Sequence, residues 1–440
     1  MIMDWRNKYK NKLIAKEEAA AIVKTGDTIT VNICDNCPYL ILDALADRMD
    51  KGDALTDLTV SGLGITKKPV RLYDPKYAGR IKFIDFFWGP QERKAQAAGA
   101  RFSYQSVHLS YRWGDMVYGR KSRVYIAAAS APDENGRVSL GPNPVDTDLL
   151  SNFDIVIIQI NEKLPFVCGK SCMLSLDEAD YIVDGPEDIV FNKSTSPSET
   201  DAKIARYVVE RVEDGSCIQL GIGGLGTAIG TFLKEKKHLG IHTEIFVDAF
   251  ADLIECGAAD NSRKNLKPGK SEFGFALLSD KVYNCLDNNP DVEGNPFSWI
   301  NDPRIISLND NVVSINSAME IDLTGQVAAE GMGMRHFSGT GGQADFVRGA
   351  RWSKGGKSFI CIPSSRTDKQ GNLHSKISLG FAPGTPVTTP RADVQYIVTE
   401  YGIAYLEYAS VSERAQRLIA IAHPQFRDEL TFEAKKAGLI

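Results

Sequence analysis

The sequence predicts an α/β fold made of two open, mostly parallel sheets. Short apolar segments are repeatedly followed by a turn and a helical pattern, which is the order expected of parallel strands joined by helices. Residues 154–160, DIVIIQI, form a continuous apolar run typical of a strand covered on both faces. At 440 residues the chain is too long for one ordinary core. The Ser-, Thr- and Pro-rich stretch 191–200 is the best linker, and we expect domains at 1–195 and 196–440.

Helices and strands alternate through the first expected domain. A helix at Lys16–Lys24 precedes a strand at Thr28–Ile33, and Pro38 opens a second helix that runs to Arg48. A further strand is expected at Arg123–Ala129. A group of aromatic residues lies before it, and we expect some of them to face a cleft although core packing is the commoner role for any single one. They are Phe83, Phe86, Phe87, Trp88, Phe102, Tyr104, Tyr111, Trp113 and Tyr118.

The second expected domain repeats the strand-turn-helix order. The expected elements are a helix at 201–213, a strand at 217–220, a helix after the glycines that follow, a strand at 241–247, short strands within 275–288 and 311–322, strands at 358–363 and 394–400, and a helix at 410–422. Two βα regions on either side of a linker indicate two similar open-sheet domains.

Composition excludes several classes of function. Lys and Arg total 51 against 56 Asp and Glu, and a net charge of −5 gives no general attraction to nucleic acid. No window approaches eighteen apolar residues, and the charged start MIMDWRNKYKNKL does not fit a secretory signal. We therefore expect a cytoplasmic protein without a membrane segment. Eight scattered cysteines indicate reduced, mostly buried thiols, and no metal site is expected from Cys34-Asp-Asn-Cys37 or from Cys168 and Cys172.

The candidate site centres on a glycine loop, Gly221-Ile222-Gly223-Gly224-Leu225-Gly226, between a strand and a helix. The loop matches the dinucleotide fingerprint, and Glu244 or Asp248 lies about twenty residues further on. In a second interpretation the loop holds the pantetheine or pyrophosphate of coenzyme A at a helix N-terminus, and Glu244 is a carboxylate nucleophile. A solvated acid at the rim of a sheet is the plainer alternative for Glu244.

A second glycine-rich loop, Ser338-Gly-Thr-Gly-Gly-Gln343, precedes another helical pattern. Successive backbone amides in such a loop can form an anion-binding nest or an oxyanion hole. A flexible surface loop is the alternative, and the loop composition alone does not separate the two.

The chain resembles the acetyl-CoA hydrolase and CoA-transferase family, and within it the butyryl-CoA:acetate and 4-hydroxybutyrate CoA-transferases. The resemblance covers nearly the whole chain and is carried by GIGG at 221–224, HTEIFVDAFADL at 242–253, FSGTGGQADFVRGA at 337–350, VTEYGIAYL at 398–406 and LIAIAHPQFRDEL at 418–430. It implies two CoA-transferase-like domains with the active site between them.

The resemblance also implies a mechanism. A glutamate, by motif Glu244, attacks the acyl-CoA carbonyl and passes through an anhydride to a glutamyl-CoA thioester. The backbone amides of Gly341 and Gly342 are the expected oxyanion donors. The positions expected to contact CoA are Gly221, Ile222, Gly223, Gly224, Leu225, Met319, Gly342 and Ser365.

Two residues or segments depart from the family pattern. Gly226 stands where the family usually has proline, and Glu407-Tyr408-Ala409-Ser410 replaces a basic run after VTEYG. A carboxylate at that place could weaken CoA binding or alter the acyl pocket.

The expected activity is that of an acyl-CoA:carboxylate CoA-transferase acting on short-chain acids, of the butyryl-CoA and acetate type. Acyl-CoA hydrolysis at the same site, an NAD-dependent oxidoreductase using the Gly221 loop, and a non-catalytic CoA sensor remain alternatives. We expect no cofactor, because the CoA thioester is a substrate, no nucleic-acid or membrane partner, and a homo-oligomer.

Overall fold

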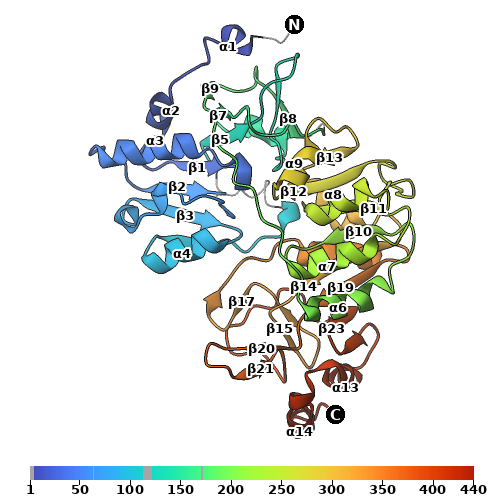
Figure 1. Cartoon of the computed structure of the whole chain (residues 1–440). Helices are drawn as coiled ribbons and strands as arrows, with labels where there is room; N and C mark the ends of the chain where they lie inside the picture. The colour runs from blue at the N-terminus through green and yellow to red at the C-terminus, as the bar shows by residue number, and fades with distance from the viewer. Residues whose placement is uncertain (1–3, 63, 112–120, 170–171) are drawn as a thin grey trace. The chain divides into compact units, whose positions relative to one another are not determined.

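The computed structural model describes residues 4–62, 64–111, 121–169 and 172–440 (Figure 1). The chain forms two compact units. Unit 1 comprises Met1–Asn192 and Glu272–Ile300, and unit 2 comprises Lys193–Ser271 and Asn301–Ile440. The first crossing from one unit to the other therefore falls inside the polar stretch 191–200. The chain then returns to unit 1 for one short segment before it completes unit 2.

Unit 1 is built on a seven-stranded sheet with the order β4-β3-β2-β1-β5-β7-β9, and each pair of neighbours is parallel. Figure 1 shows β1, β2 and β3 side by side in blue. The strands are β1 (Thr28–Val31), β2 (Leu58–Ser61), β3 (Ile81–Asp85), β4 (Phe102–Tyr104), β5 (Val124–Ala129), β7 (Ile155–Ile160) and β9 (Tyr181–Asp184). The α-helices that the structure describes before β9 in the chain are α1 (Trp5–Lys8), α2 (Lys16–Ile22), α3 (Tyr39–Asp50) and α4 (Pro90–Ala98). The predicted parallel sheet is confirmed.

Both faces of this sheet are buried. Along β5, Val124 and Ile126 join a core that contains residues of α2 and α3. The intervening Tyr125, Ala127 and Ala129 join a second core, which also receives side chains from α1 and from the strands β6 (Arg137–Ser139) and β8 (Met173–Ser175). Successive strand residues point to opposite faces, so a continuous apolar run serves both cores at once.

The aromatic segment contributes mainly to the core of unit 1. Phe83 and Phe102 stack with ring centroids 4.8 Å apart, and Tyr73 meets Phe83 edge-on at 4.9 Å. Phe86 and Trp88 are buried, whereas Tyr111 is exposed. Trp113 and Tyr118 lie outside the described residues.

The returning segment 272–300 carries a helix where strands were expected. Its elements are β12 (Ser271–Ala276), α9 (Asp280–Leu286), β13 (Val292–Gly294) and α10 (Phe297–Ile300). The prediction of short strands within 275–288 therefore holds only for the end of β12 and is wrong for 280–286, which form α9. The Ser279 side chain accepts a hydrogen bond from the Val282 backbone N–H and caps the first turn of α9.

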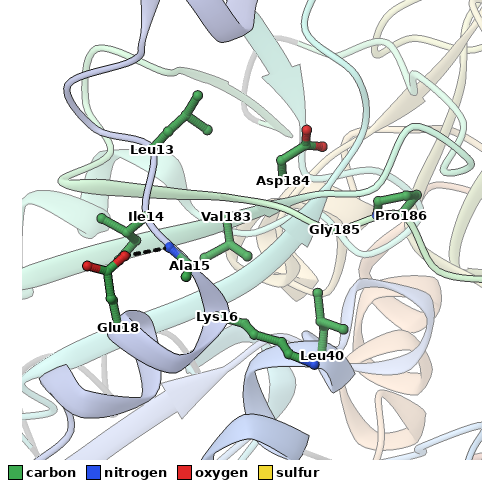
Figure 2. A pocket seen from close by; sticks show the side chains of 10 residues that line it. All are labelled: Leu13, Ile14, Ala15, Lys16, Glu18, Leu40, Val183, Asp184, Gly185 and Pro186. Carbon is green, nitrogen blue, oxygen red and sulfur yellow. Dashed lines mark hydrogen bonds between the residues drawn. The ribbon is translucent and has the colours of Figure 1, made fainter.

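Unit 1 also contains a hollow of about 590 Å³ beside its N-terminal segment (Figure 2). The segment before α2 runs alongside the edge strand β9, where the Ile14 N–H donates to the Ile182 carbonyl at 2.9 Å. In Figure 2 the Glu18 carboxylate turns back to accept from the Ala15 N–H at 2.8 Å, which fixes the first turn of α2 at the rim of the hollow. The lining residues are Leu13, Ile14, Ala15, Lys16, Glu18, Leu40, Val183, Asp184, Gly185 and Pro186. No role was expected for them from the sequence.

Unit 2 contains the second open sheet. Within the unit the strand order is β11-β10-β14-β19-β23-β24, parallel except for the hairpin between β23 and β24. These strands are β10 (Cys217–Leu220), β11 (Gly240–Phe246), β14 (Val312–Ser317), β19 (Lys357–Cys361), β23 (Tyr396–Thr399) and β24 (Gly402–Tyr405). The expected strands at 217–220, 241–247, 358–363 and 394–400 are confirmed within two residues at each end.

Helices cover this sheet in two groups. The helix α6 packs against α7 and α7 against α8, while α12, α13 and α14 supply a core shared with β19 and β23. Their bounds are α6 (Glu199–Val209), α7 (Gly224–Leu233), α8 (Asp248–Glu255), α11 (Pro303–Ile306), α12 (Gln343–Trp352), α13 (Val411–Ile421) and α14 (Arg427–Lys436). Small strands complete the unit: β15 (Glu320–Asp322), β16 (Val327–Ala328), β17 (Gly331–Met332), β18 (Arg335–His336), β20 (Ser365–Thr367), β21 (Leu373–Ser375) and β22 (Ile377–Ser378).

Three expectations from composition can be compared with the fold. All eight cysteines fall within the described ranges, none of them forms a disulfide there, and five of them are buried. Among the residues that the structure describes, no His, Cys, Asp and Glu side chains group as a metal site would require. In the same part of the chain, every helix is too short or too polar to span a bilayer.

Candidate active site

The candidate residues gather at the carboxyl ends of the strands of unit 2. The chain passes from β10 to β11 on one side and later continues from β14 to β19 on the other, so the direction of winding changes between β10 and β14. Ligands of open parallel sheets bind at such a switch point. The Gly221 loop follows β10, Met319 follows β14, and Ser365 follows β19. The three positions are neighbours because Leu220 pairs with Ile315 and Ser317 with Cys361.

The Gly221 loop leads directly into α7. Gly223 is the N-cap residue of the helix and has φ 98°, a conformation that glycine adopts without strain. Gly226 lies one turn later, and an added Cβ there would collide with the Gly221 carbonyl oxygen. The departure from proline at Gly226 therefore fits a tight contact between the loop and the first turn of α7. Ile222 is exposed at the tip of the loop.

Glu244 lies on β11 at the same edge of the sheet. Cys217 pairs with Gly240 and Ile218 with Ile241, and continuing this register places Glu244 level with Gly221. The Asn301 side chain donates a hydrogen bond from Nδ2 to Glu244 Oε2 at 2.8 Å, and Asn301 is fully buried. The plainer alternative of a solvated acid does not fit this setting.

Burial changes the acidity of Glu244. The residue keeps a little solvent exposure, but protein atoms surround its carboxyl group and disfavour the charged form. This desolvation raises the pKa of Glu244 to about 7, against the opposing effect of hydrogen bonds from Asn301 and from the Gly342 backbone. Near neutral pH the group is poised between acid and carboxylate, as expected of a functional carboxyl group.

The second glycine loop lies against this carboxylate. Gly342 is the N-cap residue of α12, and an added Cβ at Gly342 would overlap Glu244 Oε2 and Asn301 Nδ2. Gly341 has φ 56°, and its added Cβ would lie 3.8 Å from Glu244 Oε1. The structure thus brings Glu244 together with Gly341 and Gly342, which lie about a hundred residues away in the sequence. The Gly342 amide contacts the carboxylate itself, and a role for either amide as an oxyanion donor stays a prediction.

Buried side chains hold the second loop in place. Gln343 donates from Nε2 to the Ser317 carbonyl at 2.7 Å and accepts from Thr389 Oγ1 at 2.9 Å. This ties the start of α12 to the end of β14. The buried Glu330 accepts hydrogen bonds from the hydroxyls of Thr340 and Thr388, both at 3.1 Å. These contacts fix the loop that lies against Glu244, including the Gly342 backbone that bonds to it.

The carboxylate that departs from the family pattern has a structural role. Glu407 Oε1 pairs with the Arg351 guanidinium of α12 at 3.3 Å, and Glu407 Oε2 accepts from Gln395 and Tyr405 at 2.9 and 3.0 Å. Ser410 caps α13 by accepting from the Glu413 N–H. Glu407 thus replaces a cation but is paired within the fold, so it does not present a free negative charge to a ligand.

Sequence reasoning missed three residues of this site: Asn301, Glu330 and Gln343. Asn301 belongs to a short polar turn that contains no recognised motif. Glu330 lies among small residues and is far from Glu244 in the sequence. Gln343 ends the second loop motif, but nothing in the motif indicates that its amide reaches Ser317. Met319 and Ser365 lie where the strand order places them, and both are partly buried.

Comparison with known families gives two matches along the chain. Residues 2–191 match the acetyl-CoA hydrolase/transferase N-terminal domain, and residues 279–434 match the acetyl-CoA hydrolase/transferase C-terminal domain. Together the two matches span most of the sequence.

Characterised relatives match over their full length. The chain is 36% identical to the butyryl-CoA:acetate CoA-transferase of Anaerostipes caccae, covering 99% of each chain. It is 34% identical to the 4-hydroxybutyrate coenzyme A transferase of Clostridium kluyveri, covering 99% of this chain and 100% of the relative. Among solved structures, RipA from Yersinia pestis is similar with a TM-score of 0.91 and 34% identity over the whole of both chains.

Proposed function

Because the chain belongs to the acetyl-CoA hydrolase/transferase family, we propose that it is an acyl-CoA:carboxylate CoA-transferase that moves CoA between short-chain acids. The observation that carries the proposal is the buried Glu244 carboxyl group, which Asn301 and the second glycine loop hold at the switch point of unit 2. A carboxylate kept from water is a stronger nucleophile than a solvated one. The full-length relatives that transfer CoA between butyryl-CoA and acetate, or act on 4-hydroxybutyrate, support this class of substrate.

In the proposed reaction Glu244 attacks the thioester carbonyl of acyl-CoA. The carbon–sulfur bond breaks, which gives an acyl-glutamyl anhydride and a CoA thiolate. The thiolate then attacks the glutamyl carbonyl, releases the first acid as its carboxylate and leaves a glutamyl-CoA thioester. A second carboxylate reverses these steps and leaves as the new acyl-CoA, so no oxidant, reductant or cofactor is consumed.

Each attack creates a negative oxygen that needs hydrogen-bond donors. Gly341 and Gly342 lie beside the Glu244 carboxyl group, and their backbone amides are our candidates for the glutamyl oxyanion. The Gly221 loop and the N-terminus of α7 are suited to the backbone approach and negative charge of CoA. Met319 and Ser365 extend this surface past β14 and β19.

The direct test is acyl exchange. The protein is incubated with butyryl-CoA and labelled acetate, and labelled acetyl-CoA is measured while free thiol is followed in parallel. Transfer that far outruns thiol release is the expected result. Thiol release as fast as transfer would make the protein a hydrolase, and binding of NADH without binding of CoA would favour the oxidoreductase alternative.

The raised pKa of Glu244 predicts the pH dependence of transfer. Only the deprotonated carboxylate attacks, so kcat/KM should rise with pH, pass its midpoint near the pKa of about 7 and level off above it. Because the hydrogen bond from Asn301 favours the charged form, Asn301→Ala should move this midpoint to higher pH. A profile that is flat from pH 5.5 to 9 would contradict the assignment of Glu244 as the attacking group.

A further inference from the structure

A pair of cations lies on the small hairpin that follows β19. In the ladder between β20 and β21, Arg366 pairs with His374, and one step further the Lys376 N–H donates to the Ser364 carbonyl at 2.9 Å. In an antiparallel pair, two residues directly opposite each other lie on the same face, and so do residues two apart along one strand. Arg366 is opposite His374, and Lys376 is two residues after His374. Arg366 and Lys376, which we call the hairpin cations, are therefore diagonal neighbours on the same face.

Among the residues that the structure describes, no acid forms an ion pair with either of the hairpin cations. Neither side chain forms an ion pair or a hydrogen bond within the described part of the chain. Burial lowers the pKa of Lys376, the charge of Arg366 lowers it further, and the negative charge of Glu400 opposes both effects. The neighbouring acids are engaged elsewhere, because Glu400 accepts from the Ser364 N–H and hydroxyl at 2.9 and 2.6 Å and Asp368 contacts His374 at 2.8 Å.

The backbone of Lys376 connects two segments of the candidate site. Its N–H bonds to Ser364, the neighbour of Ser365, and its carbonyl accepts from the Ile321 N–H at 2.9 Å, two residues after Met319. Lys376 is thus held between the ends of β14 and β19. In the strand order β14 lies two places and β19 three places from β11, so this part of the edge is separated from Glu244 by about 10 to 14 Å.

That separation matches the construction of CoA. The pantetheine arm places the phosphate groups far from the sulfur, so a thioester at Glu244 requires the phosphates to lie further along the edge of the sheet. We propose that Arg366 and Lys376 form the site that takes a phosphate group of CoA. The identity of the ligand in this inference rests on the proposed function. Arg366 and Lys376 would supply the positive charge that is missing where Glu407-Tyr408-Ala409-Ser410 replaces the basic run of the family.

The test measures binding of free CoA by calorimetry, which needs no turnover. Lys376→Gln should weaken CoA binding on the order of tenfold or more, and Arg366→Gln should weaken it less, because an exposed cation is more strongly screened. Lys376→Arg should retain most of the affinity. Lys369→Gln, which removes a charge from the exposed turn of the same hairpin, is the matched control and should change nothing.

Truncated ligands identify the group that is bound. Pantetheine, which has no phosphate, should bind the wild type and Lys376→Gln alike. If 3′-dephospho-CoA also binds the wild type and Lys376→Gln with equal affinity, the site holds the 3′-phosphate. If it binds the wild type more tightly, the site holds the diphosphate.

Two outcomes would overturn the proposal. One is that Lys376→Gln and Arg366→Gln both bind CoA as tightly as the wild type does. This outcome would count against the proposal even if the KM for acetate rose in these variants. The other is an equal loss of affinity for pantetheine and CoA. A wild type that binds CoA but fails to exchange acyl groups would instead refute the proposed function and leave the phosphate site standing.

Discussion

Glu244→Ala is expected to lower kcat for acyl transfer by at least about 10³-fold, because it removes the group that forms the covalent intermediate in the proposed reaction. Binding of CoA should persist, since the glycine loop and the strand ends that surround Glu244 remain. Glu235→Ala changes an exposed glutamate of the same unit and should leave the rate near that of the wild type.

The covalent step of this prediction can be observed directly. Borohydride added in the presence of acyl-CoA should reduce the glutamyl thioester to an alcohol and inactivate the protein irreversibly, and the modified peptide should contain Glu244. Protein treated with borohydride alone should stay active. Near-normal turnover of Glu244→Ala, or inactivation that maps to another residue, would end the proposal.

Gly342→Ala is expected to lower kcat on the order of 100-fold without straining the backbone. The backbone of Gly342 has φ −96° and ψ 11°, which alanine tolerates, but the new methyl group would overlap Glu244 Oε2 and Asn301 Nδ2. The carboxylate must therefore move, and a displacement of about 1 Å can cost that much in rate.

The neighbouring glycine supplies a matched comparison. At Gly341 an added Cβ has room, 3.8 Å from Glu244 Oε1, but φ of 56° is unfavourable for alanine. Gly341→Ala should therefore lower the melting temperature, because conformational strain costs roughly 1 kcal/mol of folding stability. It should reduce kcat less than Gly342→Ala does. Steady-state rates and thermal unfolding of both variants test this crossed pattern. Equal effects on both quantities would mean that the loop does not contact the nucleophile as described.

The sheets could be predicted from the sequence because their signals are local. A run such as 154–160 is apolar throughout, and β7 uses alternate residues for opposite faces of its sheet. Local signals failed at 280–286, where polar and apolar residues are interspersed over only seven positions and Ser279 supplies the cap that starts α9. The polarity of that segment does not distinguish a short amphipathic helix from a strand.

The site could be predicted only in part because its contacts are distant in sequence. Glu244 and the two glycine loops lie in recognisable motifs, so the resemblance to the family identified them. Asn301 was missed because its role depends on the chain reaching Glu244 after a detour of 57 residues. Glu407 shows the reverse case, since its charge suggested an effect on the ligand, whereas the fold pairs it with Arg351.

The return of Glu272–Ile300 to unit 1 has a consequence for biosynthesis and for dissection of the protein. Unit 1 lacks part of its chain until residue 300 has been made, by which point 79 residues of unit 2, Lys193–Ser271, have already been synthesised. The units therefore cannot mature strictly one after the other as the nascent chain emerges. A cut by protease within 191–200 would leave the crossings after Ser271 and after Ile300 in the C-terminal fragment. That fragment would carry Glu272–Ile300 of unit 1 together with unit 2, and the N-terminal fragment would be an incomplete unit 1.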